Sequence, residues 1–253
     1  MIDIHAHILP GIDDGAVDME ETLEMARMAV NSGVTAVVAT PHCNVPGIFN
    51  NYYDEEYLKV FHETEKALKR EGIPLKLYQG MEVFVNANTL KLLSESKLMP
   101  MNRSRYMLVE FDFYEEIDYM QKMLEMIRKS GICPIIAHPE RYQCVQEHLQ
   151  LVYQWRMKGY LVQVNKGSLL GRFGRRAYET AHSLLSHNLV TAIASDAHSY
   201  RERTPWMLEV YEELSKKYSK RYLNTLFEEN PRKICQNQQV TSFQMMRPFD
   251  EEL

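Results

Sequence analysis

Short apolar runs alternate with longer amphipathic segments along almost the whole chain, and this alternation most constrains the fold. Several of the runs are continuously apolar, which is typical of strands covered on both faces. The expected strands span residues 2–4, 36–40, 75–80, 106–111, 133–137, 161–164 and 190–194. Helices are expected between them, over residues 20–31, 54–70, 119–129, 149–158, 175–186 and 206–216. A strand–helix alternation of this kind favours a parallel sheet.

The length of the chain limits how such a sheet is organised. A single α/β barrel typically needs about 250 residues, and this chain has 253. We therefore expect one domain with a closed or nearly closed barrel over residues 1–236, built on seven strands where the standard barrel has eight. Residues 237–253 are polar and without clear periodicity, so they are expected to form a flexible C-terminal tail.

Composition and charge exclude several classes of protein. The 29 Lys and Arg residues against 34 Asp and Glu give a net charge of −5, which leaves no electrostatic footprint for nucleic acid or anionic membrane. No stretch approaches the roughly 20 apolar residues of a membrane span, and the N-terminus lacks the features of a signal peptide. The four cysteines show no CxxC spacing and are interpreted as reduced thiols, so a cytoplasmic location is expected.

Histidine and carboxylate residues follow the expected strands. In a β/α barrel the carboxyl ends of the strands form one rim, and active sites lie there. The HxH pair of the first strand points both imidazoles to the same side, because side chains alternate along an extended segment. We expect nine side chains to converge on one pocket: His5, His7, Asp14, His42, Glu82, Glu110, His138, Asp196 and His198.

Each of these residues has an ordinary structural interpretation when it is taken alone. A glutamate after a strand is usually solvated, and a histidine before a proline can simply belong to a turn. The joint placement favours function, because five of the nine histidines fall just past expected strands. Imidazole and carboxylate ligands suit divalent ions such as Zn, Mn and Fe. The sequence therefore predicts a metal site with more than one ion.

The same set of nine residues, with the His138-Pro139-Glu140-Arg141 motif, resembles the polymerase and histidinol phosphatase (PHP) superfamily over residues 1–236. Four segments, 3–15, 39–42, 136–141 and 194–198, are more narrowly similar to the bacterial manganese-dependent protein-tyrosine phosphatases of capsule and exopolysaccharide loci. Glu110 stands where many members of the superfamily place a histidine, and this points to the same family.

The resemblance implies a distorted (β/α)7 TIM-like barrel, the PHP fold, with three divalent ions. It assigns His5, His7, Glu82 and Asp196 to one ion. Glu82 bridges to a second ion, which Glu110 and His138 complete. The third ion falls to Asp14, His42 and His198. Manganese comes from the resemblance, and iron, cobalt or zinc suit the same ligands.

The implied reaction is attack of a metal-activated hydroxide on a phosphotyrosine. The implied substrate is the tyrosine-rich tail of an autophosphorylating bacterial tyrosine kinase that controls capsule or exopolysaccharide synthesis. Arg141 and Arg203 resemble the family's phosphate-binding arginines, with Arg201 a near competitor of Arg203. Aromatic residues that fit the mouth of the pocket are Phe49, Tyr52, Tyr53, Phe113 and Tyr114. No Cys-x5-Arg motif is present, so a cysteine-dependent tyrosine phosphatase is excluded.

Three alternatives remain open at this stage. A small-molecule phosphatase of the same superfamily, acting for example on histidinol phosphate, shares the metal ligands and differs in its pocket loops. An amidohydrolase also carries an HxH on its first strand, but it normally adds a bridging lysine where this chain has Glu82. A non-catalytic scaffold for the kinase would keep the metals for structure, although a structural zinc site needs only four protein ligands.

Overall fold

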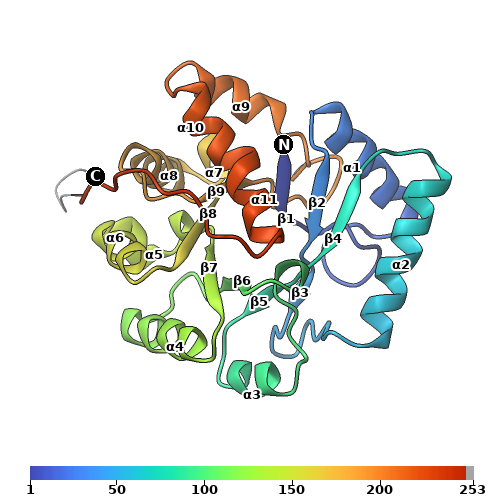
Figure 1. The fold of residues 1–253 in the computed structure, drawn as a ribbon, viewed down its shortest axis with the longest axis horizontal. Coiled ribbons are helices and arrows are strands. Elements are labelled where there is room, and N and C mark those ends of the chain that lie inside the picture. Colours follow the sequence, from blue (N-terminus) through green and yellow to red (C-terminus); the bar gives the residue numbers. More distant parts are fainter. Residues whose placement is uncertain (249–253) are drawn as a thin grey trace.

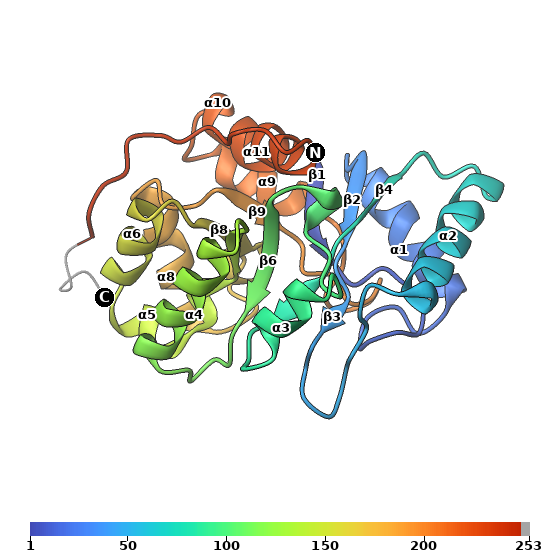
Figure 2. The same ribbon diagram turned by 60° about the horizontal axis from the view of Figure 1, so that its bottom comes forward.

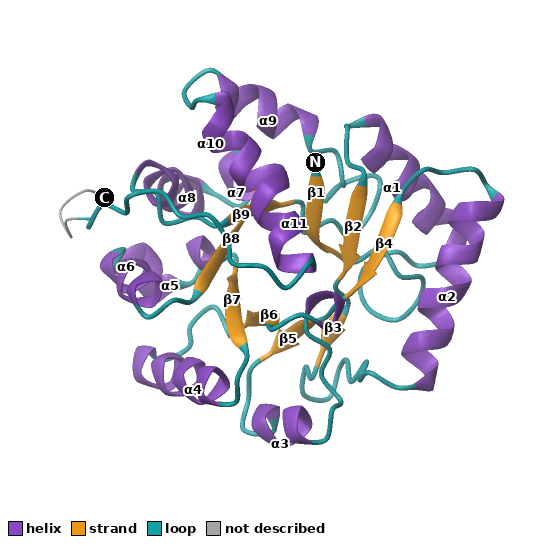
Figure 3. Cartoon of the chain, in the orientation of Figure 1, coloured by secondary structure: helices purple, strands orange, loops and turns teal. Residues whose placement is uncertain are grey.

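The computed structural model describes residues 1–248, and its strands form a ring surrounded by helices (Figures 1 and 3). The strands are β1 (Ile2–Ala6), β2 (Ala36–Ala39), β3 (His42–Cys43), β4 (Lys76–Gln79), β5 (Glu82–Phe84), β6 (Tyr106–Glu110), β7 (Cys133–Ala137), β8 (Leu161–Asn165) and β9 (Ala192–Ala194). The helices are α1 (Met19–Asn31), α2 (Glu55–Arg70), α3 (Thr89–Ser94), α4 (Ile117–Lys129), α5 (Gln143–Glu147), α6 (Gln150–Met157), α7 (Lys166–Leu169), α8 (Arg175–Ser186), α9 (Leu208–Ser215), α10 (Lys220–Asn224) and α11 (Asn230–Cys235).

All strand pairs are parallel, and the strands form two connected parts of a barrel. One part has the order β1-β2-β4 and the other the order β3-β5-β6-β7-β8-β9. β2 and β3 together take the place of one barrel strand, interrupted near Pro41, and β4 and β5 together take the place of another, interrupted at Gly80. The nine strands therefore occupy seven strand positions around the axis, which confirms the predicted distorted barrel.

The two breaks correct the prediction in detail. His42 and Glu82 were expected in loops just past strands, but each opens a short strand of its own, and the two residues pair with one another in register. Pro41 has no N–H to continue a ladder. At Gly80 an added Cβ would lie 2.6 Å from Val38 Cγ1, so only glycine fits at that bend. The breaks bring His42 and Glu82 to the rim of the barrel.

The barrel closes where the first strand meets the last. The N–H of Asp196 donates to the carbonyl of His5 at 2.8 Å, and the N–H of His7 donates to the carbonyl of Ala197 at 2.8 Å. The buried Asp3 carboxylate accepts from the N–H of Ser195 at 3.0 Å, across 192 residues of sequence. This closure places the HxH pair of β1 beside Asp196.

Apolar side chains fill the barrel and also the layer between strands and helices. The interior holds side chains such as Ile4, Val38, Leu108 and Ile135, all of them fully buried. Helix α11 covers the amino end of the barrel, and its Ile234 side chain belongs to the same interior cluster (Figure 1). The barrel is therefore a packed core closed at one end, and the rim at its other end is left for the site.

Helices α1 and α2 begin where the sequence provides capping residues. Asp18 accepts from the N–H of Glu21 at the start of α1, and Asp54 accepts from the N–H of Tyr57 at the start of α2. Both helices lie within one residue of their predicted bounds. None of the helices in the described part of the chain has the length and apolar character needed to cross a membrane. All four cysteines are free thiols.

Residues 237–248 continue from α11 across the outside of the barrel (Figure 2). The Tyr106 hydroxyl donates to the carbonyl of Gln238, Arg156 donates to the Ser242 hydroxyl, and the N–H of Met246 donates to the carbonyl of His187. Residues 249–253 lie outside the described residues, so the flexibility expected for the whole of 237–253 stays a prediction.

Candidate metal centre

The carboxyl end of the barrel brings together all nine predicted histidine and carboxylate residues. They come from the ends of separate strands and from the loops that follow: His5 (β1), His7 and Asp14 after β1, His42 (β3), Glu82 (β5), Glu110 (β6), His138 after β7, and Asp196 and His198 after β9. Most of them are buried, and only the Asp14 side chain is exposed over half of its surface. The rim is thus a cluster of titratable groups shielded from water.

Glu82 lies at the centre of this cluster. Its Oε2 is 3.2 Å from His5 Nε2, 3.2 Å from His7 Nε2 and 3.1 Å from His42 Nδ1. Its Oε1 is 3.0 Å from His138 Nε2. The two oxygens of one carboxylate therefore face different histidines, which is the arrangement expected of a carboxylate shared by two cations.

Asp196 organises a second group of contacts. Its Oδ1 lies 3.4 Å from His5 Nε2 and 3.5 Å from His7 Nε2, while Oδ2 accepts from the amide of Asn165 at 2.5 Å. The Arg203 guanidinium also contacts Oδ2. One oxygen of Asp196 thus faces the histidines, and the other is held by neighbouring donors.

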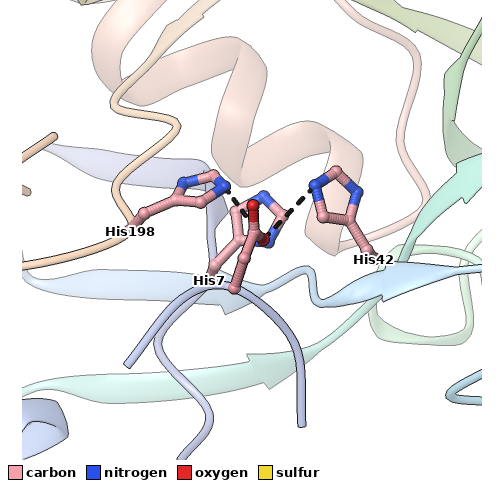
Figure 4. Close-up of side chains that lie close together, drawn as sticks. His7, His42 and His198 are labelled. Carbon is pink, nitrogen blue, oxygen red and sulfur yellow. Dashed lines mark ion pairs between the residues drawn. The ribbon is translucent and has the colours of Figure 1, made fainter. Parts of the chain in front are cut away.

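Three imidazoles form a third group near the surface of the cluster. His7, His42 and His198 point toward a common space (Figure 4). Asp14 Oδ1 lies 3.4 Å from His198 Nε2 and 3.6 Å from His42 Nε2. The ligand atoms of these four residues all lie within 4.8 Å of one another.

The distances between these polar atoms fit shared cations. Two ligands that each lie roughly 2.1 Å from one ion, at an angle of about 90–110°, are about 3.0–3.4 Å apart. Most of the nitrogen–oxygen distances around Glu82 and Asp196 fall in that range or within 0.1 Å of it. His42 Nδ1, His198 Nε2 and Asp196 Oδ1 are buried and have no hydrogen-bond partner among the described residues. Metal ligation would satisfy all three atoms.

Residues behind the cluster fix the tautomers of His5 and His7. His5 Nδ1 lies 2.9 Å from Gln163 Oε1, and His7 Nδ1 lies 2.7 Å from Asp13 Oδ2. Both oxygens only accept hydrogen bonds, so each Nδ1 carries the proton. Each Nε2 therefore presents a lone pair toward the cluster, as a metal-binding imidazole requires.

Sequence reasoning missed these supporting residues. Gln163 donates to Asn165 Oδ1 at 2.8 Å, and the N–H of Asn165 donates to the buried Glu140 carboxylate at 2.9 Å. Gln163 and Asn165 belong to β8, whose carboxyl end carries no histidine or carboxylate. The only available signal was two polar residues at alternate positions of an otherwise apolar strand. This network links Asp196 and His5 through one rigid strand.

Strained backbone conformations also mark the rim. His138 has φ of 31° and Asp196 has φ of 51°, in the left-handed region that non-glycine residues rarely occupy. His138 directly follows β7, and Asp196 follows β9 with one residue between them. Such strain persists where the surrounding structure holds it and is concentrated at functional sites.

A glycine holds the loop after β1 against the HxH segment. An added Cβ on Gly15 would lie 2.2 Å from the carbonyl oxygen of His7, so the chain can pass there only without a side chain. The N–H of Gly15 also donates to Asp13 at 2.9 Å. This close approach brings Asp13 and Asp14 to the histidines.

The crowded carboxylates of the rim have pKa values that are shifted in opposite directions. Burial opposes the ionisation of Glu82, but the facing His5 and His42 rings hold the pKa of Glu82 well below its usual range. Burial raises the pKa of Glu110 well above its usual range, and the charges of Glu82 and Asp196 reinforce the effect. The protein groups alone therefore disfavour the ionised form of Glu110, and cations would relieve this repulsion.

The two predicted arginines lie beside the cluster. Arg141 Nη1 is 3.7 Å from Asp196 Oδ2, and its guanidinium carbon lies 4.4 Å from the centroid of the Phe113 ring and 4.6 Å from that of Phe173. The Arg203 guanidinium lies 5.7 Å from the Phe173 ring. Sequence reasoning did not single out Phe173.

The competing arginine and the predicted aromatic residues occupy different positions. Arg201 is exposed and donates to the Tyr200 hydroxyl, and none of its contacts reaches the cluster. Phe49 stacks on His42 with ring centroids 5.8 Å apart. Tyr114 is 79% exposed, and Tyr52 and Tyr53 are partly buried against the hydrophobic core. Of the five predicted aromatic residues, Phe49 and Phe113 are therefore the ones that contact residues of the site.

Comparison with known proteins assigns the family. Residues 1–236 match the CpsB/CapC family of capsular polysaccharide synthesis, and the chain belongs to this family. The tyrosine-protein phosphatase YwqE of Bacillus subtilis is 35% identical over 243 residues, covering 95% of this chain and 93% of YwqE. The tyrosine-protein phosphatase CpsB of Streptococcus pneumoniae is 30% identical over 245 residues, covering 95% of this chain and all of CpsB.

A solved structure agrees with this assignment over the whole fold. It superimposes with a TM-score of 0.90 at 33% identity, covering 98% of this chain and 100% of the other. That structure belongs to work on YwqE from Bacillus subtilis and CpsB from Streptococcus pneumoniae, described as unique metal-dependent tyrosine phosphatases. The relationship extends over nearly the full length of both chains and therefore includes every residue of the rim.

Proposed function

We propose that this protein is a metal-dependent protein-tyrosine phosphatase that acts in capsular or exopolysaccharide synthesis. The observation that carries the proposal is Glu82, whose two oxygens face four histidines inside a mostly buried set of nine ligand-type residues. The names of the full-length relatives support tyrosine phosphatase activity, and the match to a metal-dependent enzyme supports the need for a metal.

The residues of the rim fit three divalent ions. His5, His7 and Asp196 supply one group of ligand atoms within 4.8 Å, and His7, Asp14, His42 and His198 supply another. Glu82 takes part in two further groups, one with His5 and His138 and one with His42 and Glu110. Manganese is the proposed metal, and iron, cobalt or zinc would suit the same nitrogen and oxygen ligands. When bound, such ions supply a nucleophile at neutral pH and neutralise charge on the phosphoryl group.

The chain itself contributes the recognition of the phosphate. Arg141 and Arg203 lie at the edge of the cluster with planar guanidinium groups that match phosphoryl oxygens in a bidentate manner. The Arg141 guanidinium contacts the Phe113 and Phe173 rings, and these contacts help to orient it before substrate binds. Phe49, stacked on His42, offers an apolar surface for the phenol ring of the substrate.

The proposed substrate is the phosphorylated tyrosine-rich tail of a bacterial tyrosine kinase. The phosphotyrosine ring would lie against the aromatic side of the rim while the phosphoryl group reaches the arginines and the metal ligands. A cytoplasmic location would give the enzyme access to such a kinase tail, and it stays a prediction for this chain.

Phosphate release provides the test. A tyrosine-phosphorylated peptide and histidinol phosphate are compared side by side with added Mn²⁺ and with EDTA. We expect EDTA-sensitive release from the peptide and little from histidinol phosphate. Release mainly from histidinol phosphate would move the protein to small-molecule metabolism with its metal site intact. Absence of release from both would favour the scaffold alternative.

A further inference from the structure

A second polar cavity lies at the opposite end of the barrel from the metal centre. It has a volume of about 390 Å³ and is bounded by the first residues of β6, β7 and β8 and by the C-terminal segment. Three arginines line it: Arg105, Arg128 and Arg156. A volume of a few hundred Å³ is the size of ordinary small-ligand sites.

The charge of this cavity is not balanced by acidic residues within residues 1–248. None of the described residues that line it is acidic, and none of the three arginines has an ion pair within the described chain. Arg128 and Arg156 lie in the last turns of α4 and α6, where each helix end carries roughly half a negative charge. Three positive charges against about one negative charge leave about two positive charges, which matches a dianion.

Arg156 forms the buried part of the site. It is only 7% exposed, and its Nη1 donates to the carbonyl of Tyr160 at 2.8 Å. Its Nε is buried without a hydrogen-bond partner in the described residues. Burial lowers the pKa of Arg156 to about 10, which reflects a charge held in the protein without a carboxylate beside it. A buried charge of this kind is costly unless a counterion accompanies it.

Arg105, Arg128 and Arg156 line this cavity together with Cys133, the first residue of β7. Arg105 stacks on the Tyr106 ring at 5.0 Å and donates to its hydroxyl at 2.9 Å, which orients its guanidinium. Arginine forks of this kind are suited to phosphate.

Part of the remaining wall of the cavity is apolar, beside the polar Gln239 and Ser242. Leu161 lies at the start of β8, and Val240 and Met245 belong to the segment that covers the cavity. The Tyr106 hydroxyl donates to the carbonyl of Gln238 and anchors this segment over the strand ends. The cavity therefore offers a cationic side and an apolar side to one ligand.

We propose that this cavity binds a small organic phosphate, with its phosphate on Arg105, Arg128 and Arg156 and its apolar part against Leu161, Val240 and Met245. The site lies across the barrel from the metal centre and uses none of the residues of that centre. It is independent of the proposed reaction, and its ligand need not be the substrate.

The test uses butylphosphonate, whose phosphorus–carbon bond resists hydrolysis, titrated calorimetrically into the full Mn²⁺-loaded protein. Two exposed arginines are replaced together in the variant R105Q/R128Q, which spares the buried Arg156 and so is expected to fold normally. The matched variant R141Q/R203Q removes the same charge from the metal-centre side. We expect the natural protein to show two classes of binding site. R105Q/R128Q should weaken binding to the cavity at least about tenfold, and R141Q/R203Q should weaken binding at the metal-centre side by the same factor.

The outcomes separate the proposal from simpler explanations. Loss of one class in R105Q/R128Q, with phosphatase activity unchanged, supports the cavity site. Identical titrations of the natural protein and R105Q/R128Q would overturn it, as would a single class that disappears in R141Q/R203Q. Methylphosphonate, which lacks most of the apolar part, should bind the cavity at least about tenfold more weakly than butylphosphonate. Equal affinities would overturn the apolar half of the proposal.

Discussion

The two ends of the barrel differ in the sign of the charge that each leaves without a partner. At the carboxyl end, Glu82, Glu110 and Asp196 crowd together, and protein groups alone hold the pKa of Glu110 far above its usual range. At the amino end, Arg105, Arg128 and Arg156 surround a cavity with no acidic lining residue in the described chain. The same rule, that a buried charge needs a counterion, indicates cations at one end and, for the buried Arg156, an anion at the other.

The largest expected effect concerns the central carboxylate. We expect Glu82→Ala to lower kcat on phosphotyrosine peptide by at least about 10³-fold, because in the proposed centre it would remove a ligand from two ions. Glu110→Ala would remove a ligand from one ion and should cost about tenfold less. Metal analysis of both purified variants checks the reason for the difference. Equal metal content in the two would refute the bridging role of Glu82.

The arginines of the metal-centre side come next. Arg141→Ala and Arg203→Ala should each lower kcat/KM by about 10- to 100-fold, as expected for the loss of charge-assisted hydrogen bonds to a phosphoryl group. Arg201→Ala is the matched control, because Arg201 is exposed and contacts Tyr200. Natural turnover in Arg141→Ala, or an equal loss in Arg201→Ala, would contradict the assignment.

An intermediate effect is expected behind the rim, at Glu140. Burial raises its pKa to about 7 from the usual 4.5. The protonated side chain therefore stabilises the fold fully below pH 4.5, and this contribution of about 3 kcal/mol is lost as the pH rises through 7. Glu140→Gln stays neutral, so its stability relative to the natural protein should increase between pH 5.5 and pH 8.

Urea unfolding of the Mn²⁺-loaded proteins at the two pH values measures this difference. The exposed Glu63→Gln serves as the control and should show no such trend. If the difference between Glu140→Gln and the natural protein is the same at both pH values, the buried carboxyl is not the group that titrates.

The smallest expected effect is at the amino end. Removing one of three neighbouring like charges by Arg128→Gln should raise the Tm by about 1–3 °C in low-salt buffer without phosphate or sulfate. Added sulfate should raise the Tm of the natural protein more than that of the variant. A lower Tm for Arg128→Gln in low salt would mean that the arginines are already balanced, and the comparison between the two ends would fail.

Much of the site at the carboxyl end of the barrel could be predicted from the sequence, because its histidine and carboxylate residues are easily recognised there. His5, His42, Glu82 and His198 belong to residue types that are conspicuous after apolar runs, and parallel strands bring their carboxyl ends to one rim. The interruptions of the strands at Pro41 and Gly80 were not predicted. In a single sequence, a residue that interrupts a strand cannot be distinguished from a residue at which the strand ends. Only the packing of Gly80 against Val38 shows the difference.

Other features depend on distances that no sequence pattern carries. Gln163 and Asn165 look like polar interruptions of β8 until the contacts with His5 and Asp196 are seen. The arginines at 105, 128 and 156 stand on three separate elements, and surface arginines are common. Burial of Arg156 and the missing carboxylate beside it emerge only when the elements have been assembled.

The closure between β1 and β9 sets the order in which the protein can become active during synthesis. Asp3 binds the backbone of Ser195 across 192 residues, and the same closure brings Asp196 to His5 and His7. Contacts so distant along the chain form late and slowly. A nascent chain emerging from the ribosome therefore carries its first two histidines long before the aspartate that completes their group, so the full set of candidate metal ligands exists only once almost the entire barrel has been made.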